Sequence, residues 1–134
     1  MFGFDKTFLT YDEQVEKRGK CLPIIVCEGS KDCLMLKRVY PYVLSTNKSS
    51  LGLNAPILRN ITNKFLLAYD NDKSGLDGIE KDKKVLRNTG AYVESIKLHN
   101  GFKDCADYLD EPKKFDELKA QIKRKLRELY EIEL

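Results

Sequence analysis

The sequence predicts an α/β fold: a mainly parallel sheet of about four strands, flanked by helices and followed by a C-terminal amphipathic helix. Two observations predict it. Short, almost wholly apolar runs recur along the chain, which is typical of strands buried on both faces of a parallel sheet. Segments with helical spacing of apolar residues separate these runs, as in a sheet built from crossover connections. In such sheets ligands bind at the carboxyl ends of the strands.

Length and composition indicate one folded domain. A chain of 134 residues has room for one hydrophobic core, and 42% hydrophobic with 34% charged residues is typical of an ordered globular protein. We therefore expect a single domain over residues 1–134. Its core covers about 22–109, preceded by an extension over 1–20 and followed by a helix over 112–134.

Membrane and secreted proteins are not favoured by the sequence. No apolar run approaches the roughly 20 residues needed to span a bilayer. Residues 1–20 lack an apolar segment flanked by basic residues and a cleavage site. We expect no membrane partner and a cytoplasmic location, in the protein's own cell or in a host cell.

Charge and cysteine content restrict the kinds of site. A net charge of only +3 argues that any nucleic-acid site is local rather than spread over the surface. The four cysteines form no C-x-x-C pair and the chain has one histidine, which argues against structural zinc. We expect free thiols, with Cys27 buried inside an apolar run.

The first part of the core predicts a strand, a helix and a second strand. The apolar run 22–27 is a strand that ends at Glu28, where Gly29 opens a turn. A helical rhythm follows over 30–39, with Ser30 as its N-cap. The next strand covers 42–45.

The middle of the chain repeats this alternation. Polar residues 46–52 form a loop, 56–61 a short helix, and 64–69 another buried strand. A helix over 74–88 follows, and Gly90 ends it. Four apolar residues can share one face of this helix: Leu76, Ile79, Val85 and Leu86.

The remaining segments complete the sheet. A fourth strand is expected over 91–98, and 103–109 is a polar loop or a short helical turn. Pro112 begins the long amphipathic helix. Its apolar face carries Phe115, Leu118, Ile122 and Leu129. The extension over 1–20 is an added strand and helix at the edge, or a mobile arm.

Three acidic clusters carry the candidate chemistry, within residues 28–32, 70–75 and 103–107. Residues two apart in an extended segment point the same way, so Asp70 and Asp72 can present two carboxylates together. Glu28, from another strand end, completes an all-oxygen site suited to Mg²⁺ or Mn²⁺. Without a cation, such acids repel one another and their pKa values rise.

Each acidic residue also has a simpler interpretation. A lone D-x-D is usually a solvated turn or a helix cap. Asp32 can also be a carboxylate in the first turn of its helix, where it interacts favourably with the helix dipole. The ordered combination is more specific. An apolar strand leads into E-G-x-x-D, a second into D-x-D-x-x-G, and K-D-x-x-D-Y follows.

This order and spacing resemble the Toprim domain family, which has a Rossmann-like fold. The motif sequences are most similar to those of the bacterial and phage primase and primase-helicase branch, and the resemblance covers residues 22–109. The motifs read Glu28-Gly29-Ser30-Lys31-Asp32, then Tyr69-Asp70-Asn71-Asp72-Lys73-Ser74-Gly75, then Lys103-Asp104-Cys105-Ala106-Asp107-Tyr108-Leu109.

The resemblance implies roles for these residues. Glu28 corresponds to a general acid/base or metal ligand, and Asp70 and Asp72 to the principal magnesium ligands. These three are the candidate catalytic residues. Three further acids correspond to residues that hold a second metal ion or incoming nucleotide phosphates: Asp32, Asp104 and Asp107.

Neighbouring residues are candidates for binding phosphate or nucleic acid. Lys31, Lys73 and Lys103 each lie beside an acidic motif and can reach phosphates as point charges, although solvation alone also explains exposed lysines. Gly29 and Gly75 are expected to allow tight turns where a ligand approaches the backbone.

The chain also departs from the primase pattern. Primases commonly carry a glycine soon after the second strand, whereas residues 45–50 contain none and the nearest is Gly52. The sequence has no zinc-binding module, no separate basic template-binding domain and no G-x-x-x-x-G-K-[ST] phosphate loop. These differences put autonomous nucleotide polymerisation in doubt.

Three functional hypotheses follow. The first is Mg²⁺-dependent, primase-like nucleotidyl transfer (DNA-directed RNA polymerase activity) by a catalytic subunit of a DNA replication complex, encoded by a phage or mobile element. Its partners would be single-stranded DNA or RNA and a helicase or zinc-binding primase protein. The second is a small Toprim nuclease or RNA-processing enzyme. The third is a non-catalytic adaptor that binds metal and nucleic acid.

Overall fold

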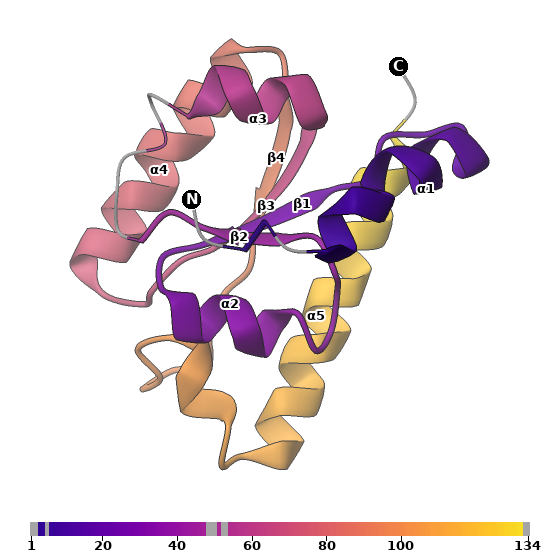
Figure 1. Cartoon of the computed structure of the whole chain (residues 1–134). Coiled ribbons are helices and arrows are strands. Elements are labelled where there is room, and N and C mark those ends of the chain that lie inside the picture. Colours follow the sequence, from indigo (N-terminus) through magenta and orange to yellow (C-terminus); the bar gives the residue numbers. More distant parts are fainter. Residues whose placement is uncertain (1–2, 5, 48–50, 52–53, 133–134) are drawn as a thin grey trace.

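A four-stranded parallel sheet forms the centre of the computed structural model, which describes residues 3–4, 6–47, 51 and 54–132 (Figure 1). The strand order is β2-β1-β3-β4. The strands are β1 (Ile24–Cys27), β2 (Val43–Ser45), β3 (Lys64–Ala68) and β4 (Tyr92–Ser95). All three strand pairs are parallel, which confirms the predicted α/β class and sheet.

The register of the sheet brings the carboxyl ends of the central strands together. Cys27, the last residue of β1, pairs with Ser45 of β2 and with Ala68 of β3. The chain leaves β1 towards β2 on one side, and later returns to β3 on the other side. This reversal makes the carboxyl ends of β1 and β3 the place where an open α/β sheet binds ligands.

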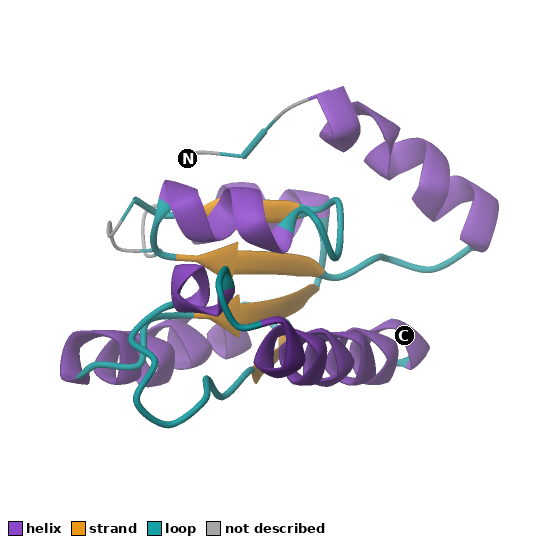
Figure 2. Ribbon diagram, turned by 90° about the horizontal axis from the view of Figure 1, so that it is seen from below, coloured by secondary structure: helices purple, strands orange, loops and turns teal. Residues whose placement is uncertain are grey.

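Helices cover both faces of the sheet (Figure 2). One face packs against α3 (Ala55–Ile61) and α4 (Lys73–Asn88). The other packs against α2 (Ser30–Leu36) and α5 (Pro112–Glu131), together with the short 3₁₀ helix η2 (Cys105–Tyr108).

The alternation of β1 explains why its sequence is continuously apolar. Ile24 and Val26 belong to the hydrophobic cluster on one face, and Ile25 and Cys27 to the cluster on the other. All four side chains are fully buried. Successive strand residues point to opposite faces, so a strand covered on both sides needs apolar residues at every position.

Two details of the helices differ from the sequence prediction. The N-cap of α2 is Gly29 rather than Ser30, which is the first helical residue. Leu76 is 51% exposed, so it does not share the buried face of α4 with Ile79 and Leu86. That face begins at Gly75, and a rotation of about 100° per residue turns Leu76 towards solvent.

The described part of the N-terminal extension consists mainly of two helical segments. It contains the 3₁₀ helix η1 (Lys6–Thr10) and α1 (Tyr11–Arg18), without the strand considered from sequence. Tyr11 is 3% exposed and its hydroxyl donates to the Leu22 carbonyl at 2.6 Å, which attaches α1 to the chain entering β1.

Two expectations about the chain as a whole can be compared directly with the structure. The four cysteines are free, and Cys27 is fully buried, as expected. Within the described ranges, no helix combines the length and apolar character that crossing a membrane requires.

Candidate metal centre

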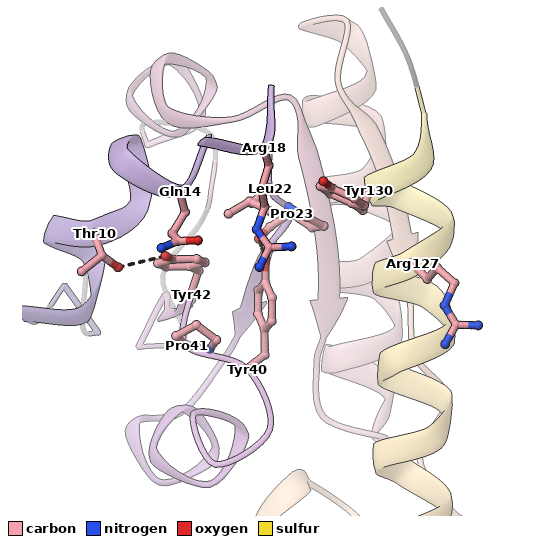
Figure 3. Close-up of a pocket in the computed structure, with 10 residues that line it drawn as sticks. All are labelled: Thr10, Gln14, Arg18, Leu22, Pro23, Tyr40, Pro41, Tyr42, Arg127 and Tyr130. Carbon is pink, nitrogen blue, oxygen red and sulfur yellow. Dashed lines mark hydrogen bonds between the residues drawn. The ribbon is translucent and has the colours of Figure 1, made fainter. Parts of the chain in front are cut away.

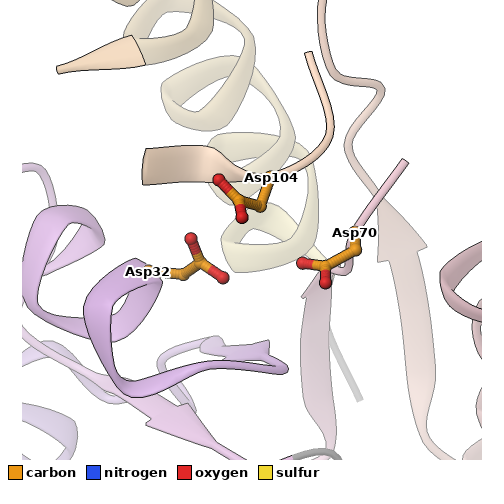
Figure 4. A group of neighbouring side chains, drawn as sticks. All are labelled: Asp32, Asp70 and Asp104. Carbon is orange, nitrogen blue, oxygen red and sulfur yellow. The ribbon is translucent and has the colours of Figure 1, made fainter. Parts of the chain in front are cut away.

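Three carboxylates from distant parts of the chain meet at the carboxyl edge of the sheet. They belong to Asp32 in the first turn of α2, Asp70 just after β3, and Asp104 at the N-cap of η2. One oxygen of each lies within 4.8 Å of the others (Figure 4). This spacing allows a single cation to contact all three side chains.

Burial makes it energetically costly for these carboxylates to be charged together. Asp32 is 5% exposed and Asp70 is 6% exposed. Burial, together with the neighbouring carboxylates of Asp104 and Asp70, raises the pKa of Asp32 to about 6, although a hydrogen bond from the Ala106 backbone lowers it. A divalent cation offsets this repulsion, and oxygen-only donors are those that Mg²⁺ and Mn²⁺ prefer. The residues present therefore fit such an ion.

Backbone donors hold two members of the third acidic cluster. The Ala106 amide donates to Asp32 Oδ1 at 3.0 Å, which docks η2 onto α2. Asp104 and Asp107 form a capping box, in which each carboxylate accepts from the other residue's amide. Asp107 also accepts from the Lys103 amide at 2.7 Å and is exposed. It stabilises the loop that presents Asp104.

Glu28 joins the ends of two strands. Its Oε1 accepts a hydrogen bond of 2.9 Å from the Asp70 amide. Glu28 thus fixes the backbone of Asp70 from β1, while its own carboxylate lies outside the group of three that meet within 4.8 Å. The roles of Glu28 as metal ligand and as acid/base remain predictions.

Asp72 serves as the N-cap of α4. Its Oδ1 accepts from the Gly75 amide at 2.7 Å. This bond satisfies one of the free amides at the start of the helix. Asp72 does not belong to the group of three carboxylates that meet within 4.8 Å. Its role as a metal ligand remains a prediction.

Gly75 allows α4 to begin against the site. A Cβ atom at this position would lie 1.9 Å from the Asp70 carbonyl oxygen and 3.0 Å from Glu28 Oε1. Only glycine permits this approach. A Cβ at Gly29 would meet Asp32 Oδ2 at 3.2 Å, which is also tight. Contact of these two glycines with phosphate or nucleic acid remains a prediction.

The lysines beside the acidic motifs are solvent-exposed. Lys31, Lys73 and Lys103 belong to the three segments that form the site. Their contact with phosphates remains a prediction. Gly52, the nearest glycine after the second strand, lies outside the described residues.

Asn71 has a role that the sequence interpretation missed. Its amide donates to the Lys103 carbonyl at 2.5 Å, and its side-chain Nδ2 donates to the Phe102 carbonyl at 3.2 Å. These bonds tie the loop after β3 to the loop that carries Asp104. The only signal in the sequence was its position between two motif aspartates.

A pocket of about 470 Å³ opens beside Asp70, between α4 and β4. Asn71, Leu76, Ser95 and Lys97 are among its lining residues. This volume lies within the roughly 300–1,000 Å³ typical of small-ligand sites. The pocket thus places space for an organic ligand next to the acidic cluster.

Comparison with protein families decides the identity of the fold. A family model described as Toprim-like matches residues 25–109, which is more than half of the chain. The chain belongs to the Toprim-like family. The match includes the Toprim motifs that begin at Glu28, Asp70 and Lys103. No curated protein matches the chain significantly.

Solved structures similar to this Toprim chain include primases. The Aquifex aeolicus primase, with zinc-binding and RNA polymerase domains, has a TM-score of 0.68 and 25% identity over 85% of this chain and 28% of that one. The primase fragment of the bacteriophage T7 primase-helicase has a TM-score of 0.60 and 22% identity over 75% and 44%. A DnaG primase catalytic domain bound to single-stranded DNA has a TM-score of 0.59 and 20% identity over 84% and 36%. The chain thus spans less than half of each.

Proposed function

We propose that this Toprim protein is the Mg²⁺-dependent catalytic part of a primase-like nucleotidyltransferase. The observation that carries the proposal is the convergence of Asp32, Asp70 and Asp104 at the carboxyl edge of a Toprim sheet. The similarity to primase structures supports synthesis as the reaction.

Asp32, Asp70 and Asp104 would hold the metal ion, with Glu28 and Asp72 as further candidate ligands. Bound there, Mg²⁺ or Mn²⁺ would supply charge stabilisation for a transferring phosphoryl group. The three carboxylates provide more negative charge than a single ion neutralises. This excess suits a second cation that arrives with a nucleoside triphosphate.

Glu28 is the residue that we propose to move the proton. Its Oε1 is held by the Asp70 amide, and its Oε2 would accept the proton from the attacking nucleotide hydroxyl. The hydroxyl oxygen then bonds to the α-phosphorus, the bond between that phosphorus and the bridging oxygen breaks, and pyrophosphate leaves. Lys31 and Lys73, exposed beside the cluster, would bind phosphate oxygens.

The substrates and partners of the proposed reaction follow from its chemistry. A template strand must lie across the acidic edge, so we propose single-stranded nucleic acid as a partner. The similar DnaG domain is described bound to single-stranded DNA, and the Aquifex aeolicus protein contains a zinc-binding domain. A helicase or zinc-binding primase protein would supply template contacts to this chain, as part of a replication complex.

Titration calorimetry with MgCl₂ and MnCl₂ tests the metal centre. The wild-type chain should bind metal, and Asp70→Asn and Asp104→Asn should bind it at least about tenfold more weakly, which corresponds to about 1.4 kcal/mol. Asp116→Asn is the matched control, because that side chain is 75% exposed on α5. Equal binding by Asp70→Asn and the wild type would contradict the site.

Primer synthesis tests the reaction. The chain is incubated with a single-stranded DNA template, labelled nucleotides and Mg²⁺, with and without candidate helicase and zinc-binding proteins. Labelled primers should form with the wild type and not with Asp70→Asn. Degradation of a labelled template without synthesis would instead assign the same site to hydrolysis. Metal binding with neither activity would favour the adaptor.

A further inference from the structure

A second pocket of about 570 Å³ lies at the amino ends of the strands, whereas the acidic cluster lies at their carboxyl ends (Figure 3). Its floor is formed by the segments that enter β1 and β2, including Leu22, Pro23 and Tyr40. The sides come from α1, with Arg18, and from α5, with Arg127 at the rim. The Arg18 guanidinium lies among the other lining residues, whereas the Arg127 guanidinium points away from them (Figure 3). The two ends of the chain therefore build this pocket together over the amino ends of the strands.

The charge of this pocket is one-sided. Arg18 and Arg127 line it, and no acidic residue does. The Arg18 guanidinium lies next to Tyr40 on the pocket floor (Figure 3). Burial raises the pKa of Tyr40, and the Arg18 charge opposes that rise. In the described part of the chain, no carboxylate forms an ion pair with either arginine. The pocket is therefore complementary to an anionic ligand.

Two of the three tyrosines that line the pocket have hydroxyl groups that are already hydrogen-bonded. The Tyr40 hydroxyl donates to the Pro23 carbonyl at 2.6 Å, and the Tyr42 hydroxyl shares a hydrogen bond of 3.0 Å with Thr10. What remains for a ligand is proline, leucine and the edges of aromatic rings, together with the Arg18 guanidinium, the Gln14 side-chain amide and Tyr130. Such a surface suits aliphatic or proline side chains next to carboxylates.

The aromatic rings are poorly placed to stack on nucleobases. Tyr42 is 3% exposed, and Tyr40 packs edge-on against it with ring centres 5.6 Å apart. The ammonium groups of Lys20 and Lys64 lie over the Tyr130 ring at 5.4 and 5.7 Å. Base stacking on open ring faces is a main source of affinity for single strands. The packing therefore favours a peptide over a nucleotide.

We propose that this pocket docks an extended acidic peptide segment of a partner protein. One of its carboxylates pairs with Arg18 inside the pocket and another pairs with Arg127 at the rim. An intervening aliphatic or proline side chain packs on Pro23 and Tyr40. Because the pocket and the acidic cluster lie at opposite ends of the strands, a bound peptide leaves the candidate metal centre accessible. The assignment is independent of the reaction catalysed there.

A peptide array tests the proposal on the intact chain. The array carries random peptides of matched length that vary in acidic, basic and aliphatic content. Retained peptides should be enriched in Asp or Glu flanking Leu, Ile, Val or Pro. The best one, labelled with fluorescein, should bind Arg18→Glu/Arg127→Glu at least about tenfold more weakly in fluorescence anisotropy, a loss of about 1.4 kcal/mol.

Lys84→Glu/Lys113→Glu is the matched control, since both lysines are exposed outside the pocket and the change in net charge is the same. Circular dichroism verifies that both variants fold. If the double arginine variant does not fold, single variants at Arg18 and Arg127 replace it. No enrichment of acidic peptides, or equal loss in the control, overturns the proposal. A fluorescein-labelled oligothymidylate serves as a second probe. If the wild type binds it, the arginine variant does not and no peptide binds, the proposal is also overturned and the pocket is assigned to nucleic acid.

Discussion

At the scale of single residues, the candidate metal centre requires carboxylates that lie close together and a backbone that allows them to do so. Asp32 and Asp70 are nearly inaccessible to solvent, so their charges are costly unless a cation is bound between them. Gly75 allows the first turn of α4 to approach the Asp70 carbonyl. The geometry of the acidic cluster thus depends on a residue that carries no charge.

Gly75→Ala should therefore harm both stability and metal binding. The new methyl group would overlap the Asp70 carbonyl, and relieving such overpacking costs about 1–3 kcal/mol. Urea denaturation should show that loss, and calorimetry should show weaker Mg²⁺ binding because Asp70 is displaced. Gly78→Ala is the control in the same helix. Its Cβ would meet Tyr69 at an ordinary 3.4 Å, and alanine should stabilise the helix by about 0.5–1 kcal/mol. Equal behaviour of the two variants would refute the role of Gly75.

At the scale of elements, the residues of the acidic motif before α4 have different structural roles. Asp70 contributes to the cluster of three carboxylates, and Asp72 caps the helix through the Gly75 amide. Asn71, between them, attaches the loop to the segment that carries Asp104. Three successive residues therefore contribute a carboxylate of the cluster, a loop contact and a helix cap.

Substitutions of Asp72 separate capping from metal binding. Asp72→Ala should destabilise the protein by about 0.5–2 kcal/mol because the cap is lost, whereas asparagine caps as well as aspartate and Asp72→Asn should be nearly neutral. We expect Asp72→Asn to weaken Mg²⁺ binding less than Asp70→Asn does, because Asp72 lies outside the close cluster. Chemical denaturation and calorimetry measure the two effects. A loss as large as that of Asp70→Asn would place Asp72 among the principal ligands.

At the scale of the whole molecule, two hydrophobic clusters on opposite faces of one sheet hold the protein together. The last helix, α5, belongs to one of them through Leu118, Ile122, Leu126 and Leu129. Lys64, at the start of β3, also donates from Nζ to the Tyr130 carbonyl near the end of α5. These contacts join the C-terminal helix to the sheet that carries the site.

Ile122→Ala tests whether α5 unfolds with the rest of the chain. The fully buried side chain leaves a cavity, which should cost about 2–5 kcal/mol. If residues 1–134 form one domain, far-ultraviolet and near-ultraviolet circular dichroism should report a single, shifted transition. Leu9→Ala, at a side chain 81% exposed, should change stability by less than about 0.5 kcal/mol. Two separate transitions would contradict the single-domain prediction.

The sequence by itself determined the fold class, the order of strands and helices, and the edge of the sheet that carries the acidic motifs. Apolar periodicity records which faces of an element are buried, and that is a local property of the chain. For the same reason the continuous run at 22–27 predicted a doubly covered strand, which β1 is.

Only the tertiary structure decided which acids meet. Asp32 joins the cluster because η2 docks on α2 through a hydrogen bond between residues 74 positions apart, and no local pattern encodes that contact. Asp72 becomes a helix cap because the chain turns into α4 at that point. The pocket between Arg18 and Arg127 likewise had no sequence signal, since it exists only where α1 and α5 are packed around the amino ends of the strands. Spacing along the chain determines direction within an element, whereas distances between elements depend on how the elements pack.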